Sequence, residues 1–186
     1  SRAVLDAASG ESFADLPYYR RRAARIGGAA VDVSRTGYTG DLGYEIWVDA
    51  DRAIEVWDAL VEAGRDHALR PAGLRALDLV RLEAGLILLG TDYTSSRHAA
   101  IPEHAYSPFE IGLKRMVDLD GGEFTGRRAL AAEQAAGGPP RRLAGVIVDW
   151  AGIEASGLAV GLAPAVPSIV SRTPVPVYAP NGPQVG

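Results

Sequence analysis

The sequence predicts an α+β fold, in which a mixed sheet carries helices on one face. Strand-like and helix-like patterns follow one another along the first 140 residues. In residues 29–34 two valines alternate with small or polar side chains, and in residues 44–48 Tyr44, Ile46 and Val48 alternate with Glu45 and Trp47, which is typical of strands. A tract of alanine, glycine and proline over 135–140 then breaks any regular element. We expect the residues beyond this tract to open a β-barrel.

The two predicted strands are joined by a loop that contains three glycines at intervals of three. Glycine adopts backbone angles closed to other residues, so this is a shaped loop rather than a minimal turn. Side chains alternate between the two faces of a strand. Glu45 and Trp47 should therefore share one face of the second strand, opposite the apolar residues Tyr44, Ile46 and Val48.

Two amphipathic helices are predicted after this hairpin. The first carries Ile54, Trp57 and Val61 at helical spacing and stops at Gly64. The second runs from about residue 71 to 85 and is apolar on two sides, which predicts burial on more than one face. A further stretch over 124–134 is rich in helix-forming residues.

Strands are also predicted near the end of the chain, over 143–150 and 174–178. Prolines within the second of these remove backbone donors, so that strand should lie at a sheet edge or beside a bulge. Two strands cannot bury a hydrophobic face unaided. We therefore expect two domains, with residues 1–140 forming the first and residues 141–186 forming the incomplete beginning of the barrel.

Composition excludes several classes of function. The chain has no cysteine, so disulfides, thiolate catalysis and cysteine-ligated metals are impossible within it. A net charge of -4 gives no basic surface for nucleic acid. The longest aliphatic run, 86–89, is too short to span a membrane, and a cytoplasmic location is expected. No metal site is predicted, because His67, His98 and His104 fall at no ligand spacing.

The pairing of Glu45 with Trp47 points to a planar ligand. An ionised carboxylate only accepts hydrogen bonds, and it can take two adjacent N–H donors in a paired, charge-assisted arrangement. The edge of a pterin offers such a donor pair. The alternative is that Glu45 is a solvated strand residue and that the glycines merely shape a hairpin.

The run from Ser34 to Ile46 (SRTGYTGDLGYEI) closely resembles the signature of the aminomethyltransferase family, the T-protein of the glycine cleavage system. Residues 81–86, 108–113 and 124–130 resemble later motifs of the family in the same order. The resemblance covers roughly residues 1–150 well and the remainder loosely.

This resemblance implies an enzyme of three domains around a central cavity that uses tetrahydrofolate, and a sheet that resembles a ferredoxin-like half. The residue at the Glu45 position holds the pterin, and the tyrosine at the Tyr38 position packs near it. Tetrahydrofolate accepts a one-carbon unit from an aminomethyl group on a lipoylated carrier (H) protein, giving methylene-tetrahydrofolate. The supporting aspartate of the family lies upstream of Ser1, so no catalytic residue is assigned in this chain and we expect the polypeptide to continue there.

One departure leaves the donor open. The family carries arginine directly before the aspartate of the second predicted helix, whereas this sequence has Leu77 before Asp78. Arg75 is the nearest cation, which makes it a candidate folate ligand, and residues 73–76 are more similar to the folate domains of dimethylglycine and sarcosine oxidising enzymes. The spacing of Arg75, Asp78 and Arg81 also fits a structural ladder of ion pairs.

Three other functions remain as alternatives. The first is a tetrahydrofolate-dependent demethylase of a small N-, S- or O-methyl compound. The second is a folate-binding module without catalysis, as in the iron–sulfur assembly branch, although the lysine-glycine-cysteine motif of that branch is absent here. The third is a scaffold domain fused to a flavin oxidase, which would require a dinucleotide-binding fold upstream.

Overall fold

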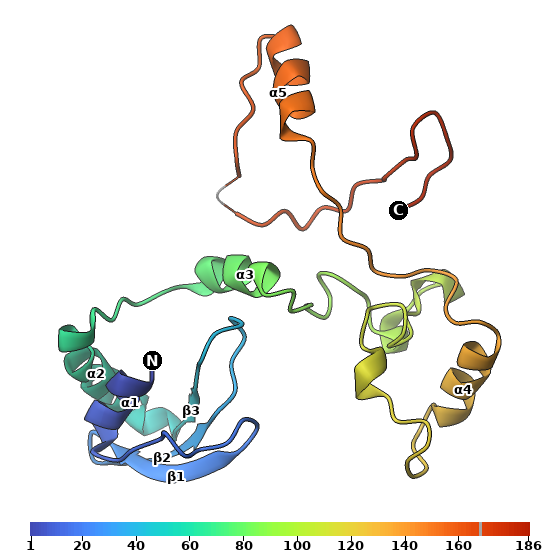
Figure 1. Cartoon of the computed structure of the whole chain (residues 1–186). Coiled ribbons are helices and arrows are strands. Elements are labelled where there is room, and N and C mark those ends of the chain that lie inside the picture. The colour runs from blue at the N-terminus through green and yellow to red at the C-terminus, as the bar shows by residue number, and fades with distance from the viewer. Residues whose placement is uncertain (168) are drawn as a thin grey trace. The chain divides into compact units, whose positions relative to one another are not determined.

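A computed structural model describes residues 1–167 and 169–186, and the chain divides into two compact units, 1–86 and 87–186. The regular elements of the first unit are α1 (Arg2–Ser9), β1 (Arg21–Ile26), β2 (Ala29–Ser34), β3 (Glu45–Trp47), α2 (Ala53–Ala63) and α3 (Leu74–Glu83), shown in Figure 1. Short 3-10 turns at Ala50–Arg52 and Arg65–His67 flank α2.

The sheet has the order β1-β2-β3, and both pairings are antiparallel. Gly27 and Gly28 form the turn between β1 and β2 with φ of 59° and 90°, as a tight hairpin requires. The predicted hairpin of β2 and β3 is confirmed, and β1 is a strand that the sequence patterns did not predict. Both pairings of this sheet are antiparallel, and the predicted mixed sheet with helices on one face stays a prediction.

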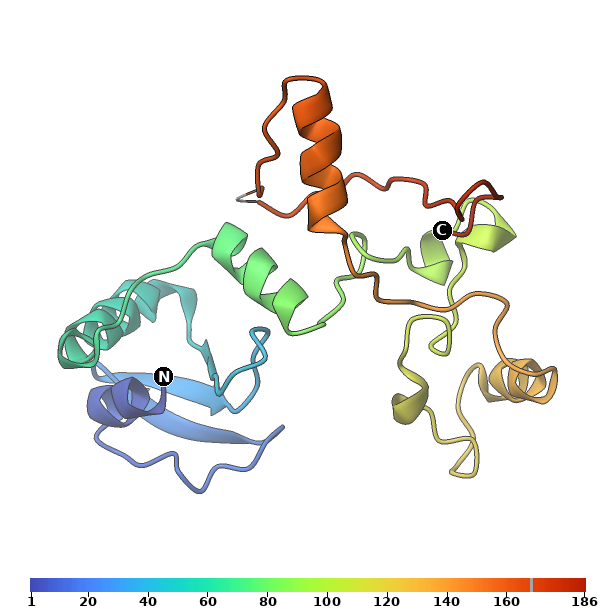
Figure 2. The same ribbon diagram turned by 45° about the horizontal axis from the view of Figure 1, so that its top comes forward.

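Both α1 and α2 lie on the same face of this sheet (Figures 1 and 2). Apolar residues that alternate along β1 and β2 meet one buried side chain from each helix, and Phe13 and Leu16 from the segment between α1 and β1 complete the core. The buried side chains are Leu5, Phe13, Leu16, Ala24, Ile26, Ala29, Val31, Val33 and Val56. The core therefore belongs to the first unit, and Tyr44, which follows the hairpin loop, packs against it.

Helix α2 forms where the sequence predicts it, but the predicted apolar stripe is not the buried one. Val56 is buried and Leu60 packs against the core, whereas Ile54 is 76% exposed and Trp57 is also exposed. Successive helical residues are about 100° apart. The face of α2 that contacts α1 and β1 therefore carries Val56 and Leu60. Ile54, two positions before Val56, lies on a different side of the helix.

Helix α3 confirms the second predicted helix, and a glycine in left-handed conformation follows its C-terminal end, as is common for helices. Gly85 has φ of 70°, its N–H donates to the Leu82 carbonyl at 2.9 Å, and the Leu86 N–H donates to the Arg81 carbonyl at 2.8 Å. The predicted burial on more than one face is wrong for this chain, since Leu74 and Leu82 are exposed.

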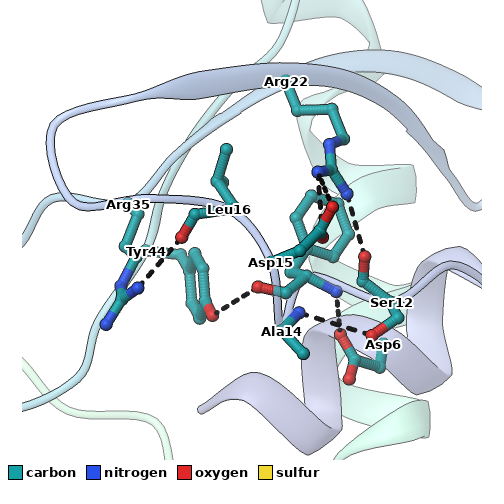
Figure 3. Close-up of polar contacts among 9 residues, drawn as sticks. Asp6, Ser12, Ala14, Asp15, Leu16, Arg22, Arg35 and Tyr44 are labelled. Carbon is teal, nitrogen blue, oxygen red and sulfur yellow. Dashed lines mark hydrogen bonds and ion pairs between the residues drawn. The ribbon is translucent and has the colours of Figure 1, made fainter.

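Polar contacts fasten the segment between α1 and β1 (Figure 3). The Asp6 carboxylate accepts the Phe13 N–H at 2.9 Å. Arg22 donates to the Asp15 carboxylate and to the Ser12 carbonyl, each at 2.9 Å, and its guanidinium lies 5.6 Å from the Phe13 ring centre. Arg22 also lowers the pKa of the Asp15 carboxyl, chiefly through this hydrogen bond. The segment is thereby attached to the helix before it and the strand after it.

The second unit contains α4 (Arg127–Ala135), α5 (Trp150–Ala159) and 3-10 turns at Ser96–His98, Pro102–His104 and Lys114–Met116. Helix α4 confirms the predicted helical stretch. The buried Glu110 carboxylate accepts from the Arg141 guanidinium at 2.8 Å and from the Ser107 N–H at 2.9 Å. Across the described residues, no helix has the length and apolar character needed to cross a bilayer.

The strands predicted over 143–150 and 174–178 are wrong. Residues 143–149 have no regular structure and Trp150 begins α5, whose first turn is capped by the Asp149 carboxylate accepting the Gly152 N–H at 3.1 Å. An extended run without a neighbour to pair with makes no ladder. Only an isolated bridge joins Tyr178 to Gln184 within the described part of the second strand region. The ferredoxin-like arrangement, the barrel and the boundary near residue 140 stay predictions.

The core makes a testable distinction between two isoleucines. Ile26→Ala should lower the free energy of unfolding by about 2–5 kcal/mol, because Ile26 is fully buried and its truncation leaves a cavity. Ile54→Ala, the same change on the exposed side of α2, should alter it by less than about 0.5 kcal/mol. Urea unfolding of both variants measures the difference, and equal losses would contradict the described core.

Candidate functional site

The glycine-rich loop between β2 and β3 encloses a cavity of about 460 Å³ together with the turn that precedes β1. We call it the loop cavity, and its walls include Tyr18, Tyr19, Arg35, Tyr38 and Asp41. Its volume lies in the range of small-molecule sites, and its walls combine aromatic rings with one side chain of each charge.

Arg35 fixes the two walls of the loop cavity against each other. Its N–H donates to the Arg20 carbonyl at 2.9 Å, and its own carbonyl accepts the Tyr19 N–H at 3.2 Å. Its guanidinium donates to the Leu16 carbonyl at 3.0 Å (Figure 3). These bonds continue the β1-β2 ladder past its last pair, Arg21 with Ser34. The turn before β1 and the loop after β2 therefore start from one fixed point.

The loop between β2 and β3 approaches the C-terminal end of α3, as both views show (Figures 1 and 2), and Gly40 is its residue next to Ala84. Its φ is 80°, and a Cβ at this position would lie 2.6 Å from the Ala84 Cβ. Glycine is thus required here by backbone angle and by space together. Leu86, just beyond α3, contributes to the cavity wall.

Glu45 lies at the edge of the loop cavity. It is exposed and does not line the cavity directly, but its Oε2 accepts a short hydrogen bond from the hydroxyl of Thr36, which does line it. The Thr36 hydroxyl is in turn 2.9 Å from the Ser34 hydroxyl. The other carboxylate oxygen has no partner among the described residues, so it is free to accept. The apolar neighbours Tyr44 and Ile46 pack on the core, which confirms the predicted alternation.

Trp47, another predicted site residue, lies on the same outer face as Glu45 but away from the loop cavity. It is 66% exposed and lines a separate hollow of about 400 Å³ with Ala23 and Asp32. A strand advances about 3.3 Å per residue, so the second residue after Glu45 is carried away from the loop. The structure does not bring Trp47 together with Tyr38.

Arg75 is likewise not brought to the loop cavity. It is exposed in the first turn of α3, while Asp78 pairs with Arg81 at 2.8 Å. Arg81 is 1% exposed and also donates to the Leu86 carbonyl at 3.2 Å. Only the second half of the predicted ladder is formed by the bonds found among the described residues.

The sequence patterns missed the aromatic pair Tyr18 and Tyr19. Their ring centres lie 4.1 Å apart at an interplanar angle of 42°, and both rings are exposed at the cavity. Hydrogen bonding with Tyr19, followed by charge repulsion, raises the pKa of Tyr18 above its usual value. The signal available in the sequence was Pro17 followed by two aromatic residues. Proline favours a turn, and turns usually lie at the surface, where a pair of aromatic rings is unusual.

Known proteins are similar to the part of the chain that contains the loop cavity. Residues 1–121 match the protein family described as GCVT N-terminal domain. The chain is 40% identical over 157 residues to an aminomethyltransferase of Halothermothrix orenii, which covers 84% of this chain and 41% of that protein. It is 44% identical over 140 residues to the aminomethyltransferase of Moorella thermoacetica, covering 75% of this chain and 36% of that protein.

A relative with another name is equally similar. The chain is 44% identical over 142 residues to the trimethylamine-oxide aldolase of Ruegeria pomeroyi, covering 74% of this chain and 17% of that protein. The chain spans less than half the length of each of these curated relatives.

Substitution of Gly40 and of Gly10 distinguishes the cost of a left-handed backbone from the cost of a steric clash. Gly40→Ala should lower the free energy of unfolding by about 1–2 kcal/mol for its left-handed backbone and by about 1–3 kcal/mol more for the clash with Ala84. Gly10→Ala provides the control, because Gly10 has φ of 72° and open space around its Cβ position. Denaturant titrations in which the two variants lose the same stability would contradict the close approach of loop and helix.

Proposed function

Because the chain belongs to the GCVT N-terminal domain family, we propose that it forms the folate-binding part of a tetrahydrofolate-dependent one-carbon transferase of the glycine-cleavage type. The observation that supports this most directly is the loop cavity, which has Tyr38 in its wall and the Glu45 carboxylate at its edge.

The residues of the loop cavity fit a reduced folate. The volume of about 460 Å³ accommodates a drug-sized ligand. Three tyrosines supply planar apolar surface, and the unpartnered oxygen of Glu45 supplies an acceptor for ring N–H donors. Glycine at position 40 lets the loop backbone approach α3 closely, since a Cβ there would lie 2.6 Å from the Ala84 Cβ.

Each residue then has a defined task. Glu45 orients the heterocycle by accepting its N–H groups, and the Thr36 hydroxyl holds the carboxylate in place through its own hydrogen bond. Tyr38 packs against the ring, and Arg35 keeps the two cavity walls at a fixed spacing. Bound tetrahydrofolate would supply the nitrogen nucleophile that accepts the one-carbon unit.

The group that stabilises the positive charge of the transfer is proposed to lie outside this chain. Such charge is best met by a fixed anion in a site from which water is excluded, whereas the two carboxylates at the loop cavity, Glu45 and Asp41, are both exposed. We therefore assign binding and orientation to the present residues and the charge-stabilising carboxylate to another part of the enzyme.

The proposed donor is an aminomethyl group on a lipoylated carrier (H) protein. A second candidate is a small N-methyl compound, which rests on the similarity to the trimethylamine-oxide aldolase of R. pomeroyi and on Leu77 in place of the family arginine. The two donors use the same folate site, so they differ in the reaction but not in the ligand of the loop cavity.

The folate site predicts a selective effect of Glu45. In the full-length protein, Glu45→Ala should weaken tetrahydrofolate binding about tenfold or more, because ring donors lose a charged acceptor worth about 1.5–3 kcal/mol. Calorimetric titration measures the affinity. Glu11→Ala is the matched control, since Glu11 is exposed in the turn after α1 and does not line the loop cavity. Equal binding by wild type and Glu45→Ala would overturn the assignment of Glu45.

The donor is tested by product formation in the full-length protein. Tetrahydrofolate incubated with aminomethylated H protein should give a one-carbon adduct detectable by mass spectrometry, and trimethylamine or its N-oxide serves as the competing donor class. An adduct from the methylated amine alone would favour the second candidate. Binding of tetrahydrofolate with no adduct from either donor would instead indicate a folate-binding module.

A further inference from the structure

Tyr19 holds a backbone conformation that aromatic residues rarely adopt. Its φ is 59°, and the other non-glycine residues with positive φ in the described chain are Ala68 and Asn181. Left-handed backbone is unfavourable for L-residues and persists where the surroundings enforce it, often at functional sites. Tyr19 therefore needs an explanation that its own local preference does not give.

The enforcing contacts come from the turn and from β2. The turn runs from Pro17 to Arg20 and is closed by the Arg20 N–H donating to the Pro17 carbonyl at 3.1 Å. Tyr19 is the third residue of this turn, where a positive φ ordinarily selects glycine or asparagine. Its N–H is held by the Arg35 carbonyl at 3.2 Å, so the backbone is fixed from both sides.

The tyrosine side chain gains little from the fold in return. Tyr19 is 67% exposed and Tyr18 is 59% exposed, so neither ring buries the area that usually justifies an aromatic residue. The two rings contact each other at 4.1 Å and line the same cavity as Tyr38. A glycine at position 19 would satisfy the backbone and remove the ring from the cavity.

We propose that Tyr19, with Tyr18 beside it, is an aromatic wall of the loop cavity that stacks on a planar ring of the bound ligand, and that it is retained at a cost in fold stability. This inference rests on the proposed folate function and adds a binding residue to the same site. Stacking on an exposed aromatic pair is favourable, because the ligand ring covers apolar surface that is otherwise hydrated.

If Tyr19 is such a wall, replacing it with glycine should raise fold stability and lower the affinity for tetrahydrofolate. In the full-length protein, Tyr19→Gly should raise the melting temperature by about 1–3 °C, because strain is removed. The same change should weaken tetrahydrofolate binding about threefold to tenfold, because the ring is lost. Tyr19→Phe should keep the wild-type affinity and melting temperature, since it retains both the ring and the backbone strain.

Ala68→Gly is the matched control, because Ala68 has φ of 52° and is exposed outside the loop cavity. It should raise the melting temperature as Tyr19→Gly does and leave tetrahydrofolate affinity unchanged. A lower melting temperature for Tyr19→Gly, or unchanged affinity, would overturn the aromatic wall while leaving the folate function standing. Absence of tetrahydrofolate binding by the wild-type protein would overturn both.

Discussion

The loop cavity depends on the contacts of Arg35. This residue is the first after β2. Its backbone and side chain form hydrogen bonds with three backbone groups of the segment before β1: the carbonyls of Leu16 and Arg20 and the N–H of Tyr19. The buried hairpin of β1 and β2 holds Arg35 in place, so the rigidity of the core reaches both walls of the cavity. Binding residues on loops are effective when a rigid scaffold positions them in this way.

The sequence predicts those parts of the fold that depend on local patterns. Helix α2 ends at Ala63, directly before Gly64, and α3 ends at Glu83, two residues before Gly85, so both stops lie close to the predicted glycines, and the alternation in β3 is present. Which face of α2 is buried could not be read from periodicity, because Ile54 and Val56 are similar in polarity and only the contacts with α1 and β1 distinguish them. The alternating pattern over 143–150 misled for a related reason, since a strand requires a neighbour and Asp149 offers a helix cap instead.

For the candidate site, the motif identified the loop but not the complete set of residues around it. Tyr38 lines the cavity and Glu45 lies at its edge, in accord with the motif. Trp47 shares a strand face with Glu45 without sharing the cavity, which a period of two cannot reveal. Tyr19 was missed because its importance comes from a positive φ and from a bond to Arg35, sixteen positions later in the chain, and neither appears in a local pattern.

We propose that the Glu45 carboxylate, held at the edge of the loop cavity by Thr36, accepts hydrogen bonds from a folate heterocycle. A crystal structure of the full-length protein with tetrahydrofolate bound tests it most directly. We expect pterin N–H groups at about 2.7–3.2 Å from the Glu45 oxygens, with the ring beside Tyr38. Tetrahydrofolate bound elsewhere, with Glu45 facing solvent, would contradict it.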